Sequence, residues 1–253
     1  MTRRRFYAAP EAFSSDATSA ILNDDETKHL RQVLRLKIGA EVYVFDGEGR
    51  EFRAQIQQIA RNSTQLIIIE EAEPASPESC LHLTLAVALL KGEKFDLVLQ
   101  KLTELGVTHV VPLITSRAGV RIRSDADALR KLDRSRRIAL EATKQCGRAR
   151  LMTIEKPTSF AEMIARADKT GGLRLMFAER AGESLAAASE QVTSVPDHVS
   201  ALTGPEGGWT DDEIDQARAA RWRIVTLGSR IMRAETAAIA CSALLQHRFG
   251  DLK

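Results

Sequence analysis

From residue 81 to the end of the sequence, short apolar runs typical of β-strands alternate with segments that have one apolar helical face. The predicted strands cover residues 81–90, 109–114, 151–155, 173–179, 198–202 and 223–228. The predicted helices cover residues 93–105, 125–147, 159–169 and 184–191, a segment beginning at 211, and residues 234–247. This alternation predicts an α/β fold with a mostly parallel sheet that is covered on both faces. Such sheets bind ligands at the carboxyl ends of their strands.

The first part of the sequence has a different pattern, dominated by short β-rich runs. Strands are predicted at residues 41–45, 51–59 and 65–70, with a hairpin between the first two, and a helix is predicted at residues 24–35. The segment AEPASPES has two prolines and no apolar periodicity, which is typical of a linker. We therefore expect a small β-barrel domain at residues 1–72, a linker at 73–79 and an α/β domain at 80–253.

The composition excludes several classes of protein. With 44% hydrophobic and 28% charged residues among its 253, the sequence is typical of a soluble globular protein. No apolar run approaches the roughly 20 residues that cross a bilayer, and the N-terminus lacks the apolar region of a secretory signal. The three cysteines are far apart and the five histidines have no metal-ligand spacing. We therefore expect a cytoplasmic protein with no membrane contact, no metal and no disulfide framework.

Positive charge is concentrated between Arg117 and Arg150. This segment has eleven basic and four acidic residues, a net charge of +7, whereas the whole protein carries only +2. Arginine dominates this segment and also the cluster at residues 3–5, and its planar guanidinium suits phosphate groups. Such clusters are typical of nucleic-acid-binding proteins, although a solvated helix face would give the same pattern.

The stretch TGPEGGWTDDEI, residues 203–214, follows a predicted strand. Its three glycines and one proline surround Glu206, and a tight turn needs fewer, so we predict a backbone that lets a ligand approach closely. Thr210 and Glu213 fit a capping box, and the two aspartates between them would repel a phosphate at that helix start. The stretch therefore favours a ligand that is not held by phosphates, the alternative being a plain strand-to-helix connection.

The next connection, LGSRIMRAETA, carries Arg230 and Arg233 at the start of a predicted helix. Cations at this position oppose the helix dipole at a cost of about 0.3–1 kcal/mol each. Two of them indicate a task such as holding an anionic or electron-rich substrate, unless each pairs with a carboxylate such as Glu206 or Glu235. The helix itself is apolar nearly all round, which predicts either deep core or core on one side and a subunit interface on the other.

Together, GPEGGWTDDEI and LGSRIMRAETA resemble the motifs of the RsmE-type 16S ribosomal RNA methyltransferases, which belong to the SPOUT class. Four more segments follow the order of that family: RRRFYA, HLRQVLRLKIGAEVYVFDGEG, KGEKFDLVLQKLTELGV and EATKQCGR. Trp209 stands where phenylalanine is common. The resemblance implies an N-terminal PUA-like RNA-binding β-barrel and a C-terminal SPOUT α/β domain with a deep trefoil knot. It also implies a homodimer that uses S-adenosyl-L-methionine to methylate N3 of one uridine in the 16S ribosomal RNA of the small subunit.

The resemblance also implies roles for individual residues. Arg230 and Arg233 would be catalytic, because an arginine can stabilise the negative charge of a deprotonated uracil. The expected cofactor-binding residues are Phe177, Thr203, Gly204, Pro205, Glu206, Gly207, Gly208, Leu227, Gly228, Ile231, Met232 and Arg233. The expected RNA-binding residues are Arg4, Arg5, Arg31, Arg35, Arg121, Arg137, Gln145 and Arg148. Two alternatives stay open: another SPOUT reaction such as ribose 2′-O methylation, and a non-catalytic RNA-binding module of ribosome assembly.

Overall fold

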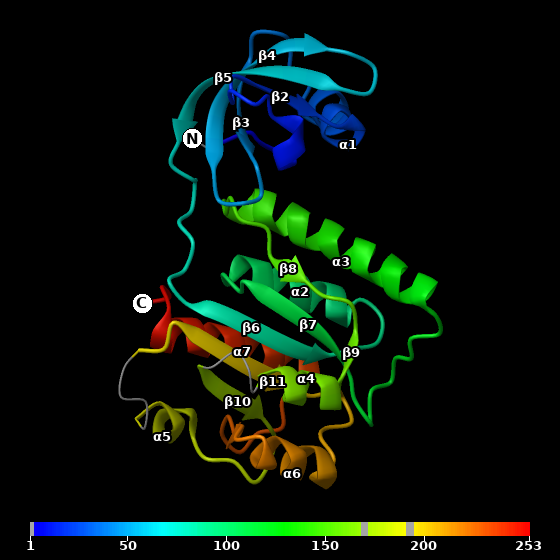
Figure 1. Cartoon of the computed structure of the whole chain (residues 1–253), viewed down its shortest axis with the longest axis vertical. Helices are drawn as coiled ribbons and strands as arrows, with labels where there is room; N and C mark the ends of the chain where they lie inside the picture. Colours follow the sequence, from blue (N-terminus) through cyan, green and yellow to red (C-terminus); the bar gives the residue numbers. More distant parts are fainter. Residues whose placement is uncertain (1–2, 168–171, 191–194) are drawn as a thin grey trace. The chain divides into compact units, whose positions relative to one another are not determined.

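The computed structural model describes residues 3–167, 172–190 and 195–253 (Figure 1). The protein forms two compact units: Met1–Glu78 with Thr143–Leu151, and Ser79–Ala142 with Met152–Lys253. The long helix α3, Asp125–Cys146, begins in the second unit and ends in the first. Two predicted helices, at 159–169 and 184–191, reach positions 168–169 and 191, which lie outside the described residues.

The first unit is built on a five-stranded sheet in the order β1-β3-β4-β5-β2. The strands are β1 (Arg5–Tyr7), β2 (Ser19–Leu22), β3 (Glu41–Phe45), β4 (Glu51–Ile59) and β5 (Thr64–Ala72). Strands β1 and β3 pair in parallel, and the other pairs are antiparallel. Because the sheet has two end strands, it is a curled half-barrel rather than a closed barrel. The hairpin β3–β4 and strand β5 confirm the predicted strands, whereas β1 and β2 were not predicted.

The predicted helix at 24–35 forms in two pieces. Helix α1 (Asp24–Lys28) continues as a π-helical turn, η2 (His29–Val33), and a short 3-10 turn, η1 (Pro10–Ala12), precedes them. The Asn23 side chain caps α1 by accepting a hydrogen bond from the Glu26 amide at 3.0 Å. The helix ends before Arg35, whose φ of 52° lies in the left-handed region where a right-handed helix cannot continue.

The second unit contains a seven-stranded sheet in the order β12-β10-β11-β6-β7-β8, with β9 also paired to β7. The strands are β6 (His82–Ala88), β7 (His109–Ile114), β8 (Thr153–Ile154), β9 (Thr158–Ser159), β10 (Leu173–Phe177), β11 (His198–Thr203) and β12 (Arg223–Val225). The helices, besides α3, are α2 (Lys94–Glu104), α4 (Phe160–Ala167), α5 (Leu185–Glu190), α6 (Asp211–Ala219) and α7 (Ala234–Phe249). The strand pairs of this sheet are parallel, which confirms the predicted architecture.

Each face of this sheet has its own apolar core. On one face, leucines and valines of β6 pack with buried residues of α2, α3 and α7, such as Val98, Leu102 and Leu245. On the other face, Phe160 and Met163 of α4 pack with Trp209 and residues of α6. The carboxyl ends of β10, β11 and β12 therefore meet at one edge, between these helical layers (Figure 1). The trefoil knot that the resemblance implies stays a prediction.

Candidate active site

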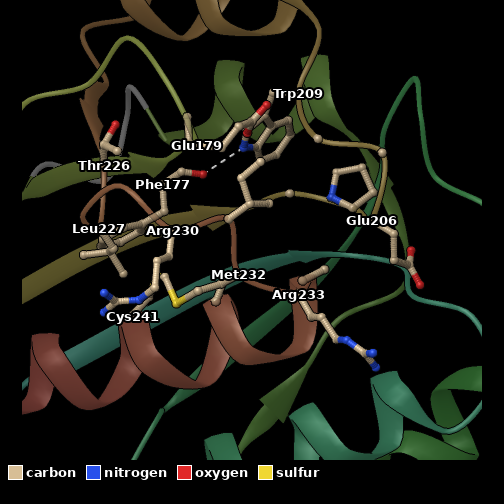
Figure 2. A pocket seen from close by; sticks show the side chains of 18 of the residues that line it. Phe177, Glu179, Glu206, Trp209, Thr226, Leu227, Arg230, Met232, Arg233 and Cys241 are labelled. Atoms are coloured by element: carbon tan, nitrogen blue, oxygen red, sulfur yellow. Dashed lines mark hydrogen bonds between the residues drawn. The ribbon is translucent and has the colours of Figure 1, made fainter.

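A cavity of about 510 Å³ lies at the carboxyl edge of the sheet in the second unit (Figure 2). Three connections form its walls: Phe177–Glu179 after β10, Gly204–Trp209 after β11, and Thr226–Arg233 after β12. The first turns of α7 contribute Ala234, Ala237 and Cys241, and α2 contributes Lys94. This cavity thus lies where the parallel sheet predicted a ligand site.

The structure brings most of the sequence-predicted cofactor residues together. All of them except Thr203 line this cavity, as do both predicted catalytic residues, Arg230 and Arg233. Thr203 is the last residue of β11 and is 1% exposed, so its side chain belongs to the buried sheet. Residues separated by more than fifty positions in the sequence therefore share one hollow.

The glycines of the 203–210 loop are required by the protein's own packing. A Cβ atom on Gly204 would lie 2.9 Å from the Trp209 indole nitrogen, and one on Gly207 would lie 3.0 Å from Cβ of Arg117. Gly208 has a φ of +67°, which disfavours any other residue. The glycine-rich sequence predicted that this room serves a ligand, whereas in the structure Trp209 and Arg117 occupy much of it.

Trp209 fixes the shape of the loop from inside. Its indole is 1% exposed and donates a hydrogen bond from Nε1 to the Phe177 carbonyl at 2.9 Å (Figure 2). This bond ties the end of β10 to the connection after β11, two of the three walls of the cavity. Phenylalanine, which is common at this position in the resembling family, lacks a donor for such a bond.

Two arginines hold the same loop from outside. Arg117 donates from Nη1 to the carbonyls of Gly207 and Trp209, each at 3.2 Å. Arg180 donates to the Trp209 carbonyl at 3.1 Å and to Asp211 at 2.7 Å, and it also pairs with Glu179. The predicted capping box at Thr210 and Glu213 is present, and Glu213 accepts a further hydrogen bond from the Ser116 amide at 2.9 Å.

Glu206 points toward α2 and not toward the arginines. It accepts hydrogen bonds from Lys94 Nζ at 3.2 Å and from the Lys91 amide at 3.4 Å. Partial burial raises the pKa of Glu206, but hydrogen bonds from its own backbone, Lys94 and Lys91 outweigh burial and hold the pKa below its ordinary value. Glu206 is therefore a carboxylate at neutral pH.

Arg230 and Arg233 are both exposed, and among the described residues neither has an ion pair. The alternative partners, Glu206 and Glu235, both lie near Lys94 instead, at 3.2 and 3.9 Å. In Figure 2 the two guanidinium groups extend on opposite sides of Met232. Each is therefore available to a negatively charged group that enters the cavity.

The predicted RNA-binding residues divide into two groups. Arg4, Arg31, Arg35, Arg121, Arg137 and Gln145 are exposed. Arg5 and Arg148 are buried: Arg5 pairs with Glu51 and donates to the carbonyls of residues 143, 144 and 148, and Arg148 pairs with Glu78. Buried guanidinium groups with these partners are structural. Arg5 and Arg148 are therefore not accessible to RNA, contrary to the prediction.

Some cavity residues were not predicted from the sequence, among them Lys94, Glu179, Thr226 and Cys241. Glu179 could have been found, because it is the last residue of the predicted strand 173–179 and so must lie at the carboxyl edge. Cys241 lies on the inner side of α7, four residues after Ala237, and burial raises the pKa of its thiol. It is a wall residue rather than a nucleophile.

Three of the five histidines, which had no pattern in the sequence, come together at the amino edge of the same sheet. His82 and His198 stack with ring centroids 4.8 Å apart, and both line a second cavity of about 440 Å³ with His109. Within the described residues, no group of three histidine, cysteine or acidic side chains could hold a metal ion. Among all the described residues, no helix is both long and apolar enough to cross a bilayer.

Comparison with known proteins links both units to RNA modification. Residues 77–246 match a family described as an RNA methyltransferase domain, and residues 22–69 match an RNA methyltransferase PUA domain. A Synechocystis protein described as ribosomal RNA small subunit methyltransferase E is 34% identical over 92% of this protein and 74% of its own length. The Bacillus subtilis protein of the same name is 27% identical over 96% of this protein and 95% of its own length.

Solved structures agree with this similarity. A ribosomal RNA small subunit methyltransferase E from Neisseria gonorrhoeae, bound to S-adenosyl methionine, superposes with a TM-score of 0.86 at 31% identity. The alignment covers 99% of this protein and 100% of the Neisseria chain. A methyltransferase from Legionella pneumophila with bound SAM gives a TM-score of 0.89 at 30% identity, with both chains fully covered.

Proposed function

The protein belongs to the RsmE family of ribosomal RNA small subunit methyltransferases, and from this premise we propose that it methylates N3 of one uridine in 16S ribosomal RNA with S-adenosyl-L-methionine. The observation that carries this proposal is the cavity at the carboxyl edge, whose walls include both family motifs. Both SAM-bound relatives, from Neisseria and Legionella, share the whole fold.

The cavity suits this cofactor. Its volume of about 510 Å³ falls in the range of small-molecule sites. Phe177, Leu227, Ile231 and Met232 offer apolar surface, and the backbone of the 203–210 loop offers amide and carbonyl groups to an adenosine. The cofactor has no phosphate, which matches the acidic start of α6, and its sulfonium cation is compatible with the nearby carboxylate of Glu206.

The reaction makes one electrostatic demand on the protein. The cofactor supplies an electrophilic methyl group, and N3 of uridine becomes a good nucleophile only when it loses its proton. The negative charge then spreads over N3, O2 and O4. An unpaired guanidinium at the cavity, from Arg230 or Arg233, stabilises that charge as it develops, and the walls hold N3 in line with the methyl group.

The exposed arginines bind the RNA in this proposal. Arg121 and Arg137 in the second unit, and Arg4, Arg31, Arg35 and Gln145 in the first, contact phosphates or base edges. We keep the expected organisation of a PUA-like domain at 1–72, a linker at 73–79 and a SPOUT domain at 80–253 with its knot, although residues 143–151 of that last range belong to the first compact unit. The cytoplasm, where ribosomes assemble, is the expected location.

We also propose a homodimer that uses the outer side of α7. The buried side of this helix carries Ala238, Cys241 and Leu245, whereas Ile239 and Ala240 are half-buried and Leu244 is 39% exposed. A helix that is apolar on its exposed side as well is typical of a subunit interface. Sedimentation equilibrium would test this, and a monomer at micromolar concentration would contradict it.

The test of the function is calorimetric titration with S-adenosyl-L-methionine, followed by nucleoside mass spectrometry of methylated small subunits. Ala237→Leu should block the cofactor by filling the cavity, whereas Ala219→Leu, at an exposed position of α6, should not. Gly207→Val is a poorer test, because its side chain would meet Arg117 first. A 2′-O-methylated ribose would identify the other SPOUT reaction, and RNA binding without cofactor binding would identify an assembly module.

A further inference from the structure

The loop between β7 and α3, residues 115–124, lies beside the 203–210 loop in the second unit. It carries three exposed arginines, Arg117, Arg121 and Arg123. Two of its residues reach across to the 203–213 segment: Arg117 through its side chain and Ser116 through its amide, which donates to Glu213. A basic, exposed loop and a wall of the cavity are thus joined directly.

Arg117 makes most of this connection. One nitrogen, Nη1, donates to both the Gly207 and the Trp209 carbonyls at 3.2 Å, and the Arg117 Cβ packs against Gly207. Both carbonyls belong to residues that line the cavity. The position of the guanidinium and the conformation of the cavity wall therefore depend on each other.

Arg117 differs from Arg180, which holds the loop from the other side. Arg180 donates to the same Trp209 carbonyl but is neutralised by Asp211 and Glu179. Arg117 has no ion pair among the described residues, although Asp211 lies near enough to interact with its charge, and its side chain is exposed. Its charge and remaining N–H groups can therefore bind a phosphate while Nη1 keeps the loop carbonyls.

Building on the proposed function, we propose that Arg117 is a positioning residue that couples RNA binding to cofactor binding. A phosphate on Arg117 fixes the guanidinium and thereby the wall formed by Gly207 and Trp209, so that less ordering remains when the cofactor binds. By linkage, the cofactor must raise the affinity for RNA by the same factor.

The experiment is a calorimetric titration with S-adenosylhomocysteine, which prevents turnover, with and without saturating small ribosomal subunits from cells that lack the enzyme. We expect the subunits to tighten binding to the wild-type protein by a factor of roughly 5 to 150, the usual range of such coupling. Arg117→Ala should bring this factor close to one. Arg121→Ala, on the same loop, should weaken subunit binding but keep the factor once subunits are saturating.

Arg117→Lys shows whether the loss of coupling in Arg117→Ala could come from misfolding. Thermal unfolding of each variant measures its stability independently. Lysine keeps the charge but lacks the fork that reaches two carbonyls and a phosphate together, so subunit binding should persist while the coupling is lost. A wild-type factor of one, or full coupling in either Arg117 variant, would overturn the inference. Absence of cofactor binding and methylation in the wild type would instead refute the proposed function, so the two failures are distinguishable.

Discussion

Arg5 and Arg233 show how little an arginine's role depends on its neighbours in sequence. Both lie in basic stretches, and both were expected to act on RNA or substrate. Arg5 is 7% exposed and bonded to Glu51 and three carbonyls, whereas Arg233 is exposed at the cavity and has no ion pair among the described residues. Burial thus separates a structural arginine from one available for chemistry.

Arg5→Ala should lower the free energy of unfolding by about 3–5 kcal/mol. It removes the buried guanidinium from three carbonyls and from Glu51, which within the described part of the chain keeps only the longer contact with Arg3 and the Ala75 amide. The exposed neighbour offers a matched control: Arg4→Ala should change the free energy of unfolding by less than about 0.5 kcal/mol. Urea unfolding measures both. Equal stability of the two variants would show that Arg5 is not structural.

Arg233→Ala should lower kcat by about 10²–10³ at saturating cofactor, the usual effect of losing one donor to a developing negative charge. Single-turnover methylation measures this effect, and calorimetry shows whether the cofactor still binds. Arg230→Ala, assayed in parallel, identifies which guanidinium acts on the base, because the two extend on opposite sides of Met232 (Figure 2). Normal turnover in both variants with cofactor bound would remove this role from both arginines.

Trp209→Phe should lower the free energy of unfolding by about 1–3 kcal/mol, because the Phe177 carbonyl loses the indole donor inside the core. The indole also packs over Gly204, so the smaller ring leaves space there. Denaturant unfolding tests this, and Trp222→Phe is the control, since the nitrogen of that buried indole has no hydrogen-bond partner among the described residues. A larger loss in the control would contradict the argument.

At the scale of elements, local signals predicted the helix starts better than the strands. The capping box of α6 was readable because its partners are three residues apart. Strands β1 and β2 have three and four residues, and each depends on a partner far away in sequence, such as Tyr43 for Arg5. The glycine loop was found as a site, but its partners Arg117 and Arg180 could not be, because no spacing rule links residues so far apart.

The stability of helix α4 should depend on pH through Glu162, which lies in its first turn. The Glu162 carboxylate accepts hydrogen bonds from the Ser159 amide, the Ser159 hydroxyl and the Thr158 hydroxyl, which lower its pKa from 4.5 to about 2. A lowered folded-state pKa means that the stabilisation is complete above pH 4.5 and is lost as the pH falls toward 2. Carboxyl NMR titration of Glu162 measures this, and Glu162→Gln identifies its resonance, because that variant lacks the carboxyl group. Titration near 4.5 would contradict it.

At the scale of the whole molecule, strand–helix alternation was enough to predict a parallel sheet with its ligand site at the carboxyl edge. The strand order β12-β10-β11-β6-β7-β8 was not predictable, because the alternation does not say which strands are neighbours. That order decides which connections line the cavity. Only the family resemblance brought the connections after β11 and β12 together in advance.

RNA affinity should fall steeply with salt if the exposed arginines bind phosphates. Arg121→Ala and Arg137→Ala should each reduce the slope of log affinity against log salt concentration by about 1. Binding of small subunits at several salt concentrations measures the slope. Unchanged slopes in both variants would place the phosphate contacts elsewhere.

Because helix α3 has residues in both units, it limits how segments of the gene can be exchanged by recombination. Its last residues, from Thr143 on, belong to the first unit, where carbonyls of residues 143, 144 and 148 accept the hydrogen bonds of Arg5. A gene fragment for residues 1–78 alone would encode an N-terminal unit without these acceptors. A single recombination crossover after residue 78 would therefore separate the N-terminal segment from two side chains that pair with it, Lys144 with Glu26 and Arg148 with Glu78, so the two halves of the gene are expected to evolve together.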